Sequence, residues 1–247
     1  MIQGQRAFSV NVESWSVSLQ GGNHAENQDA FLNWADHRLW AVADGMGGGL
    51  DGAGASKAVV KFLTKVPAPD SLDRHIRNVT RQLENANDFL QTAGRAAGGV
   101  SASTALVLLL NAGSAACLWA GDSRCYIFRD GVLYQCTKDH TLRQEKIDSG
   151  ELTALEAGRM ISDKIITNAV GVHDALRLSE VRFPLRAGDK FLLCSDGLSH
   201  LVETKALPVY MARPTAKEAV ESMVETLDER RLPDDVTLMT VFLSEQV

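Results

Sequence analysis

The stretch Leu39-Trp40-Ala41-Val42-Ala43-Asp44-Gly45-Met46-Gly47-Gly48-Gly49 decides the fold, because an apolar run ends abruptly there in one acid and a set of glycines. The run predicts a buried strand that carries a carboxylate at its end. The glycines allow the backbone to come close to whatever that carboxylate holds.

Three further apolar runs have an acid at one end: residues 115–120 with Asp122, residues 190–195 with Asp196, and residues 236–242 with Asp234. If these strands lie side by side, their acids meet at one rim. Carboxylates that close raise one another's pKa, so the site needs cations. A ligand set made only of oxygens suits Mg²⁺ or Mn²⁺.

The composition, with 23% charged and 45% hydrophobic residues among 247, predicts one large globular domain. A net charge of -6 without a basic stripe argues against nucleic acid or an anionic membrane as the main partner. The start lacks a signal-peptide core, and the longest aliphatic run, residues 105–110, is too short to span a bilayer. We therefore expect a cytoplasmic monomer that binds no membrane.

The four cysteines form no CxxC pair, and we interpret them as reduced residues of the core: Cys117, Cys125, Cys136 and Cys194.

Alternating apolar residues predict strands over residues 8–12 and 15–19, followed by a hairpin over residues 31–43. The Asp130-Gly131 pair predicts the turn of a second hairpin over residues 126–134. Further strand residues, including Ser103 and Thr104, are expected from residue 102 to residue 110.

Helical periodicity predicts helices over residues 55–66, 72–90 and 216–227, the last after a capping box at Thr215. A second capping box at Thr153 predicts a short helix within the polar residues 141–180. Antiparallel strands segregated from a few amphipathic helices indicate an α+β layered sandwich.

Six motifs occur in order: Asn27-Gln28-Asp29, Ala43-Asp44-Gly45-Met46-Gly47-Gly48, Gly121-Asp122-Ser123-Arg124, Thr137-Lys138-Asp139-His140, Cys194-Ser195-Asp196-Gly197-Leu198 and Asp234-Asp235-Val236-Thr237. This series resembles that of the metal-dependent serine/threonine protein phosphatases of type 2C, the PPM family. The resemblance implies a four-layer α-β-β-α sandwich, with two antiparallel sheets flanked by helices and a dinuclear metal site at one end. It also implies that residues 1–247 form a single catalytic domain, in which residues 141–180 are a variable, flap-like insertion.

By this resemblance, Asp44 bridges two Mn²⁺ or Mg²⁺ ions and Gly45 gives its backbone carbonyl to one of them. Asp196 and Asp234 bind the other ion. The implied chemistry is direct attack on phosphorus by a water that bridges the ions, so Asp44 and Asp196 act in catalysis through that water.

The resemblance gives two further acids weaker roles: Asp29 acts through a metal-bound water, and Asp122 helps Asp196 to hold a third ion. His24 stands where the family often has an arginine that clamps the substrate phosphate. Histidine cannot offer a bidentate fork, so phosphate binding is weaker, pH-dependent or taken over by another residue. Asp235 replaces a common asparagine, and its added charge either favours metal binding or is solvated.

Asp139 and His140 are interpreted as a structural pair, and Arg124 as a residue that bonds nearby backbone or carboxylate. The resemblance implies a phosphatase acting on phosphoserine and phosphothreonine in proteins, opposed to a bacterial serine/threonine kinase. In size the chain is similar to secretion-associated members. Two alternatives stay open: a catalytically silent regulatory module that binds phosphoproteins, and a metal-dependent hydrolase of small phosphoesters. An aspartic-protease dyad is disfavoured, because the Asp-Thr/Ser-Gly order is absent.

Overall fold

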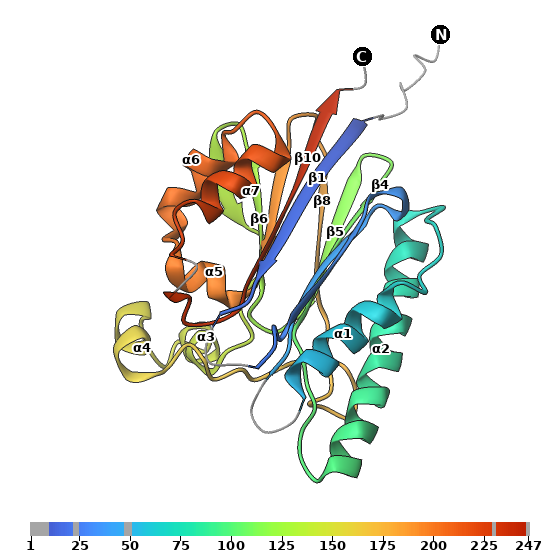
Figure 1. The fold of residues 1–247 in the computed structure, drawn as a ribbon, viewed down its shortest axis with the longest axis vertical. Helices are drawn as coiled ribbons and strands as arrows, with labels where there is room; N and C mark the ends of the chain where they lie inside the picture. The colour runs from blue at the N-terminus through green and yellow to red at the C-terminus, as the bar shows by residue number, and fades with distance from the viewer. Residues whose placement is uncertain (1–9, 22–24, 47–50, 229–230, 246–247) are drawn as a thin grey trace.

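The computed structural model describes residues 10–21, 25–46, 51–228 and 231–245. Within them, two five-stranded antiparallel sheets pack face to face, with helices on both outer sides (Figure 1). The first sheet has the order β1 (Val10–Leu19), β10 (Val236–Glu245), β9 (Lys190–Cys194), β6 (Arg124–Arg129) and β7 (Val132–Gln135). The second has the order β2 (Asp29–Trp34), β3 (Leu39–Asp44), β4 (Ala105–Asn111), β5 (Ser114–Ala120) and β8 (Ser179–Pro184).

The helices form the outer layers. The second sheet is covered by α1 (Gly52–Leu63) and α2 (Leu72–Ala97). The first sheet is covered by α5 (Asp196–Leu201), α6 (Leu207–Met211) and α7 (Ala216–Val224). Near one end of the sandwich lie α3 (Leu142–Asp148) and α4 (Ala154–Met160) (Figure 1). The chain also forms two short 3-10 helices, η1 (Ala35–His37) and η2 (Thr204–Ala206). The expected α-β-β-α sandwich is confirmed.

The unbroken apolar run of β3 follows from its central position. Leu39, Ala41 and Ala43 face α1 and α2, whereas Trp40 and Val42 face the other sheet. Successive side chains of a strand point to opposite faces, so a strand covered on both sides needs apolar residues at every position. All five are at most 1% exposed.

Both predicted hairpins are confirmed. β2 and β3 are joined by η1, and β6 and β7 are joined at Asp130 and Gly131, whose φ angles are 53° and 78°. Two successive residues with positive φ match the tight turn that Asp-Gly favours. The Thr153 capping box is present, and the Thr215 hydroxyl accepts the Glu218 N–H as expected.

Several boundaries differ from the sequence prediction: α1 spans Gly52–Leu63 instead of residues 55–66, and α7 ends at Val224 instead of residue 227. The two opening strands are one strand, β1, which pairs continuously with β10. The second helix runs past Leu90 to Ala97, and Gly94 within it leaves room for the following chain, since a Cβ atom there would lie 2.9 Å from the Gly99 carbonyl oxygen. Strand β4 starts only at Ala105.

The polar residues 141–180 hold two short helices, and only α4 was predicted. The missed helix α3 starts at Thr141, whose hydroxyl accepts the Gln144 N–H. A Thr followed three residues later by Gln is a known helix-start pattern, so the signal was present.

The cysteines lie where the sequence predicted. Cys117, Cys125 and Cys194 are buried, and Cys136 is half-buried against the core between the sheets. In the part of the chain described here, no helix combines the length and the apolar character needed to cross a bilayer.

Candidate metal centre

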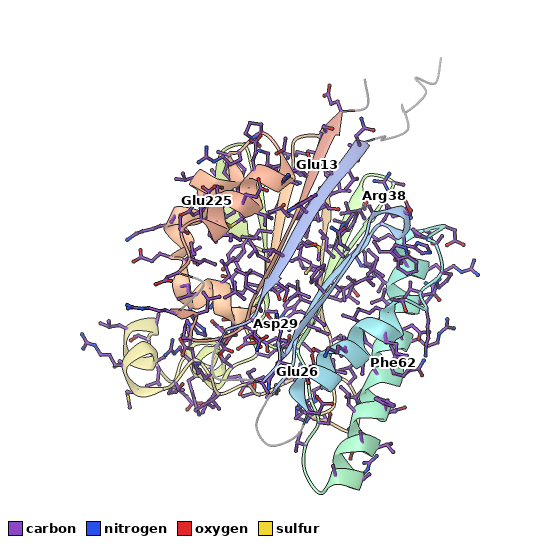
Figure 2. The ribbon with its side chains drawn as sticks, viewed as in Figure 1. Glu13, Glu26, Asp29, Arg38, Phe62 and Glu225 are labelled. Carbon is purple, nitrogen blue, oxygen red and sulfur yellow. The ribbon has the colours of Figure 1, made fainter. Side chains whose placement is uncertain are left out.

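Five aspartates gather at one end of the sandwich from both sheets. Asp29 begins β2 and lies opposite Asp44, the last residue of β3. Asp122 follows β5, Asp196 follows β9, and Asp234 precedes β10. Figure 2 shows Asp29 at the lower end of the sheets, far from Arg38 at the turn between β2 and β3. The strands do not all lie side by side: β2, β3 and β5 belong to the second sheet, whereas β9 and β10 belong to the first, so the acidic rim forms across the gap between the two sheets.

The pKa values of these acids show that their charges act on one another. Burial raises the pKa of Asp44 well above its usual value, and the charges of the other four aspartates raise it further. Burial likewise raises the pKa of Asp29 and of Asp122 to about 7. Burial and the charge of Asp234 raise the pKa of Asp196. Such shifts mark a site built to hold positive charge.

Asp29 is held by the start of α5. The Ser195 hydroxyl donates to its Oδ2 atom at 2.7 Å, and the Asn27 Oδ1 atom accepts the Asp29 N–H at 2.8 Å. Ser195 is fully buried and accepts the Thr237 N–H at 2.9 Å. The hydroxyl thereby fixes an acid of one sheet to the backbone of the other.

Gly45 is required by the close approach of two backbone segments. A Cβ atom there would lie 1.9 Å from the carbonyl oxygen of Gly52 and 2.8 Å from that of Gln28. The Gly45 N–H donates to the same Gln28 oxygen at 2.9 Å. Only glycine lets the end of β3 lie against the start of α1.

Thr104 fixes Asp44 and was not recognised from sequence, where it was interpreted as a strand residue. Its Oγ1 atom accepts the Asp44 N–H at 2.9 Å and lies 2.9 Å from the Ser123 hydroxyl, beside Asp122. Thr104 is fully buried. A lone threonine before an apolar strand gives no signal of this role.

Asp235 is not solvated, and its charge acts on the rim by raising the pKa of Asp29. It is 3% exposed, and its carboxylate accepts the Gly21 N–H at 2.8 Å and the Gln28 N–H at 2.6 Å. It therefore ties the loop before β2 to the start of β10. The solvated alternative is wrong.

Arg124 bonds a nearby carboxylate as expected, whereas Asp139 and His140 bond to other partners and not to each other. The Arg124 guanidinium donates three hydrogen bonds of 2.6 to 3.1 Å to the Asp139 carboxylate. The His140 Nδ1 atom accepts the Gly121 N–H, and Nε2 lies 2.9 Å from the Ser179 hydroxyl. His24 lies outside the described residues.

The donor set fits a hard divalent ion. Asp122 is 5% exposed, and its Oδ1 atom has no hydrogen-bond partner among the residues described. The rim supplies carboxylate oxygens together with the Gly45 carbonyl, which are the ligands that Mg²⁺ and Mn²⁺ prefer. Across the described ranges, no three acid, histidine or cysteine side chains already close around one point.

The two packed sheets and the aspartates at one end of them place this chain in the class of α+β sandwich proteins that have an acidic centre between two sheets. The family model for protein phosphatase 2C matches residues 21–239, and the chain belongs to that family.

Two relatives have known structures that are similar to this chain. PppA, a key regulatory component of T6SS in Pseudomonas aeruginosa, is 34% identical with a TM-score of 0.85, covering 94% of this chain and 97% of that one. The catalytic domain of serine threonine protein phosphatase PstP in complex with two manganese ions is 28% identical with a TM-score of 0.81, covering 96% and 100%.

Among curated proteins, the serine/threonine protein phosphatase PstP of Mycobacterium tuberculosis is 34% identical over 234 residues. The alignment covers 90% of this chain and 43% of that relative, so the chain spans less than half of its length.

Proposed function

We propose that this chain is a metal-dependent phosphatase that hydrolyses phosphoserine and phosphothreonine in proteins. The observation that carries the proposal is the convergence of five buried or half-buried aspartates from both sheets in a chain of the protein phosphatase 2C family. A phosphoryl group is an anion, and it reaches such a rim only if cations neutralise the carboxylates.

The residues divide into ligands and supports. Asp44, Gly45, Asp196 and Asp234 would hold two Mn²⁺ or Mg²⁺ ions, Asp29 would act through a water, and Asp122 would hold a third ion. When bound, such ions supply Lewis acidity and lower the pKa of a water near phosphorus. Thr104 and Ser195 hold Asp44 and Asp29 in position through hydrogen bonds.

The likeness to the Mn²⁺ complex of the PstP domain supports a dinuclear site. The likeness to PppA, a regulatory component of T6SS, supports a role beside a secretion system. We further propose that a serine/threonine kinase opposes this phosphatase and that residues 1–247 act as one catalytic domain.

The test is hydrolysis of p-nitrophenyl phosphate and of a phosphothreonine peptide with Mn²⁺, Mg²⁺ or EDTA, beside Asp196→Asn. We expect metal-dependent turnover that EDTA abolishes and that Asp196→Asn lowers by about a hundredfold or more. Asp88→Asn, on the exposed face of α2, is the matched control. Turnover that persists in EDTA would refute the proposal. Phosphopeptide binding without turnover would favour the silent regulatory module.

A further inference from the structure

Residues 161–166 run beside the acidic rim and are held in place from one side by α3. The Arg143 guanidinium donates two hydrogen bonds to the Ile161 carbonyl, at 2.7 and 2.9 Å, and a third to the Asp163 carboxylate at 3.1 Å. The Leu142 N–H donates to the Ile165 carbonyl at 2.9 Å. The backbone of this segment therefore has a defined position relative to the rim.

Two consecutive residues of this segment lie beside the rim, Lys164 in direct contact with a rim carboxylate and Asp163 linked to another through His200. Asp163 lies 3.5 Å from the Nε2 atom of His200, whose Nδ1 atom lies 3.5 Å from Asp196. Lys164 Nζ lies 3.6 Å from the Oδ2 atom of Asp234. The positive charge of Lys164 also acts on the Asp196 carboxyl and lowers its pKa against the effect of burial. The ammonium group of Lys164 thus faces the proposed metal centre itself.

Lys164 differs from Arg124 and His200, two other nitrogen-bearing side chains near the rim, in how loosely it is held. Arg124 is committed to Asp139 through three short hydrogen bonds, and only 25% of its side chain is exposed. His200 is shared between two carboxylates. The Lys164 side chain is 62% exposed, and its contact with Asp234 is long. Exposed ion pairs of this kind contribute little free energy, so Lys164 can change partner at low cost.

We propose that Lys164 binds the phosphate group of the substrate phosphomonoester at the metal centre. The inference rests on the proposed function and adds the residue that recognises the phosphate dianion. A cation of the protein, beside the metal ions, further offsets the repulsion between a phosphoryl group and five carboxylates. Lysine supplies a compact charge on a flexible stem, and a charge-assisted hydrogen bond to a phosphate oxygen is stronger than its contact with Asp234.

The experiment compares Lys164→Ala and Lys164→Arg with Lys146→Ala. Lys146 lies in the same part of the chain, but its ammonium group pairs with Glu151. The measurements, at saturating Mn²⁺, are KM and kcat for p-nitrophenyl phosphate and a phosphothreonine peptide, and the inhibition constant of inorganic phosphate. The Mn²⁺ dissociation constant of each variant is measured by calorimetry.

Lys164→Ala is expected to raise both KM and the phosphate inhibition constant about tenfold, which is the effect of losing one hydrogen bond to a charged group. We expect kcat to change less, Lys164→Arg to recover most of the affinity, and Mn²⁺ affinity to stay at the wild-type value. If KM and the phosphate inhibition constant of Lys164→Ala equal those of Lys146→Ala, the inference is overturned. Weaker Mn²⁺ binding in Lys164→Ala would also overturn it, because the residue would then support the metal centre.

The outcomes separate this inference from the proposed function. Metal-dependent turnover with an unaffected Lys164→Ala variant refutes only the role of Lys164. If the wild-type protein shows no turnover with either metal, the proposed function fails, and calorimetry with inorganic phosphate and Mn²⁺ still decides whether Lys164 binds phosphate. Equal phosphate affinity in the wild type and in Lys164→Ala would then refute the role of Lys164 in phosphate binding.

Discussion

The Ser195 hydroxyl donates a 2.7 Å hydrogen bond to the Oδ2 atom of Asp29, so the start of α5 holds the first residue of β2 across the gap between the sheets. The same oxygen accepts the Thr237 N–H at 2.9 Å. One buried atom therefore sets the distance between an acid of the second sheet and the backbone of β10.

Ser195→Ala is expected to weaken Mn²⁺ binding about tenfold, because partners that orient metal ligands typically contribute that much. It also leaves the Thr237 N–H without its acceptor, which lowers the free energy of unfolding by about 1–3 kcal/mol. Calorimetry and urea unfolding measure the two effects. Ser222→Ala, whose hydroxyl only donates to the Ala219 carbonyl within α7, should leave Mn²⁺ binding unchanged. Wild-type Mn²⁺ affinity in Ser195→Ala would contradict the positioning role.

Gly45→Ala should abolish turnover while Gly158→Ala leaves it intact. At Gly45 a Cβ atom would lie 1.9 Å from the Gly52 carbonyl oxygen, so the end of β3 or the start of α1 must move. At Gly158, within α4, nothing lies within 4 Å of a Cβ atom. Alanine there should stabilise the helix by about 0.5–1 kcal/mol.

The measurement for this pair is metal-dependent turnover together with the midpoint of thermal unfolding. We expect Gly45→Ala to lose at least about a hundredfold in kcat/KM, because a misplacement of about 1 Å already costs that much. Equal activity in the two variants would show that the rim tolerates a displacement of β3.

The sequence identified Asp44, Asp122, Asp196 and Asp234 because each stands at or near the end of an apolar run, whereas Asp29 was identified only through the family resemblance. It did not identify Thr104, Ser195 or Asp235 as supports, because their roles depend on contacts between segments more than 40 residues apart. Nor could periodicity show that Asp196 and Asp44 belong to different sheets. Pairing order is a long-range property, whereas apolar patterning reports only which faces of one strand are buried.

Asp235 offers a test of this long-range support. Asp235→Ala removes the acceptor of both the Gly21 and the Gln28 N–H groups, which join the loop before β2 to β10. We expect the free energy of unfolding to fall by about 2 kcal/mol, since each unpaired buried donor costs about 1–3 kcal/mol and these two are only partly buried. Asp235→Asn keeps one acceptor oxygen and should lose less.

Urea unfolding of the two variants, beside Asp88→Ala on the exposed face of α2, measures the order of these losses. If Asp235→Ala is no less stable than Asp88→Ala, the two backbone bonds contribute nothing to stability. A lower free energy of unfolding for Asp235→Asn than for Asp235→Ala would show that the asparagine NH₂ group faces one of the N–H groups, so that no oxygen accepts that hydrogen bond.

His75 provides the pH dependence. It is fully buried in α2, and within the described part of the chain neither of its ring nitrogens has a hydrogen-bond partner. Burial, together with the nearby charge of His37, lowers the pKa of His75 from 6.5 to about 4. The folded protein therefore holds the imidazole neutral, whereas the unfolded chain protonates it near pH 6.5.

Because the pKa is lower in the folded state, the unfolded state binds more protons between pH 6.5 and pH 4, and stability falls as the pH falls through this range. The full effect is about 3 kcal/mol, at 1.36 kcal/mol for each unit of pKa. His75→Phe removes the titrating group, so its unfolding free energy should lose about 3 kcal/mol less than that of the wild type between pH 7 and pH 4. Urea unfolding of both proteins across this range measures the difference. Because both proteins contain the same rim acids, the contribution of these acids cancels in the difference. Parallel stability curves would show that His75 titrates alike in the folded and unfolded states, and a buried imidazole without partners could not do so.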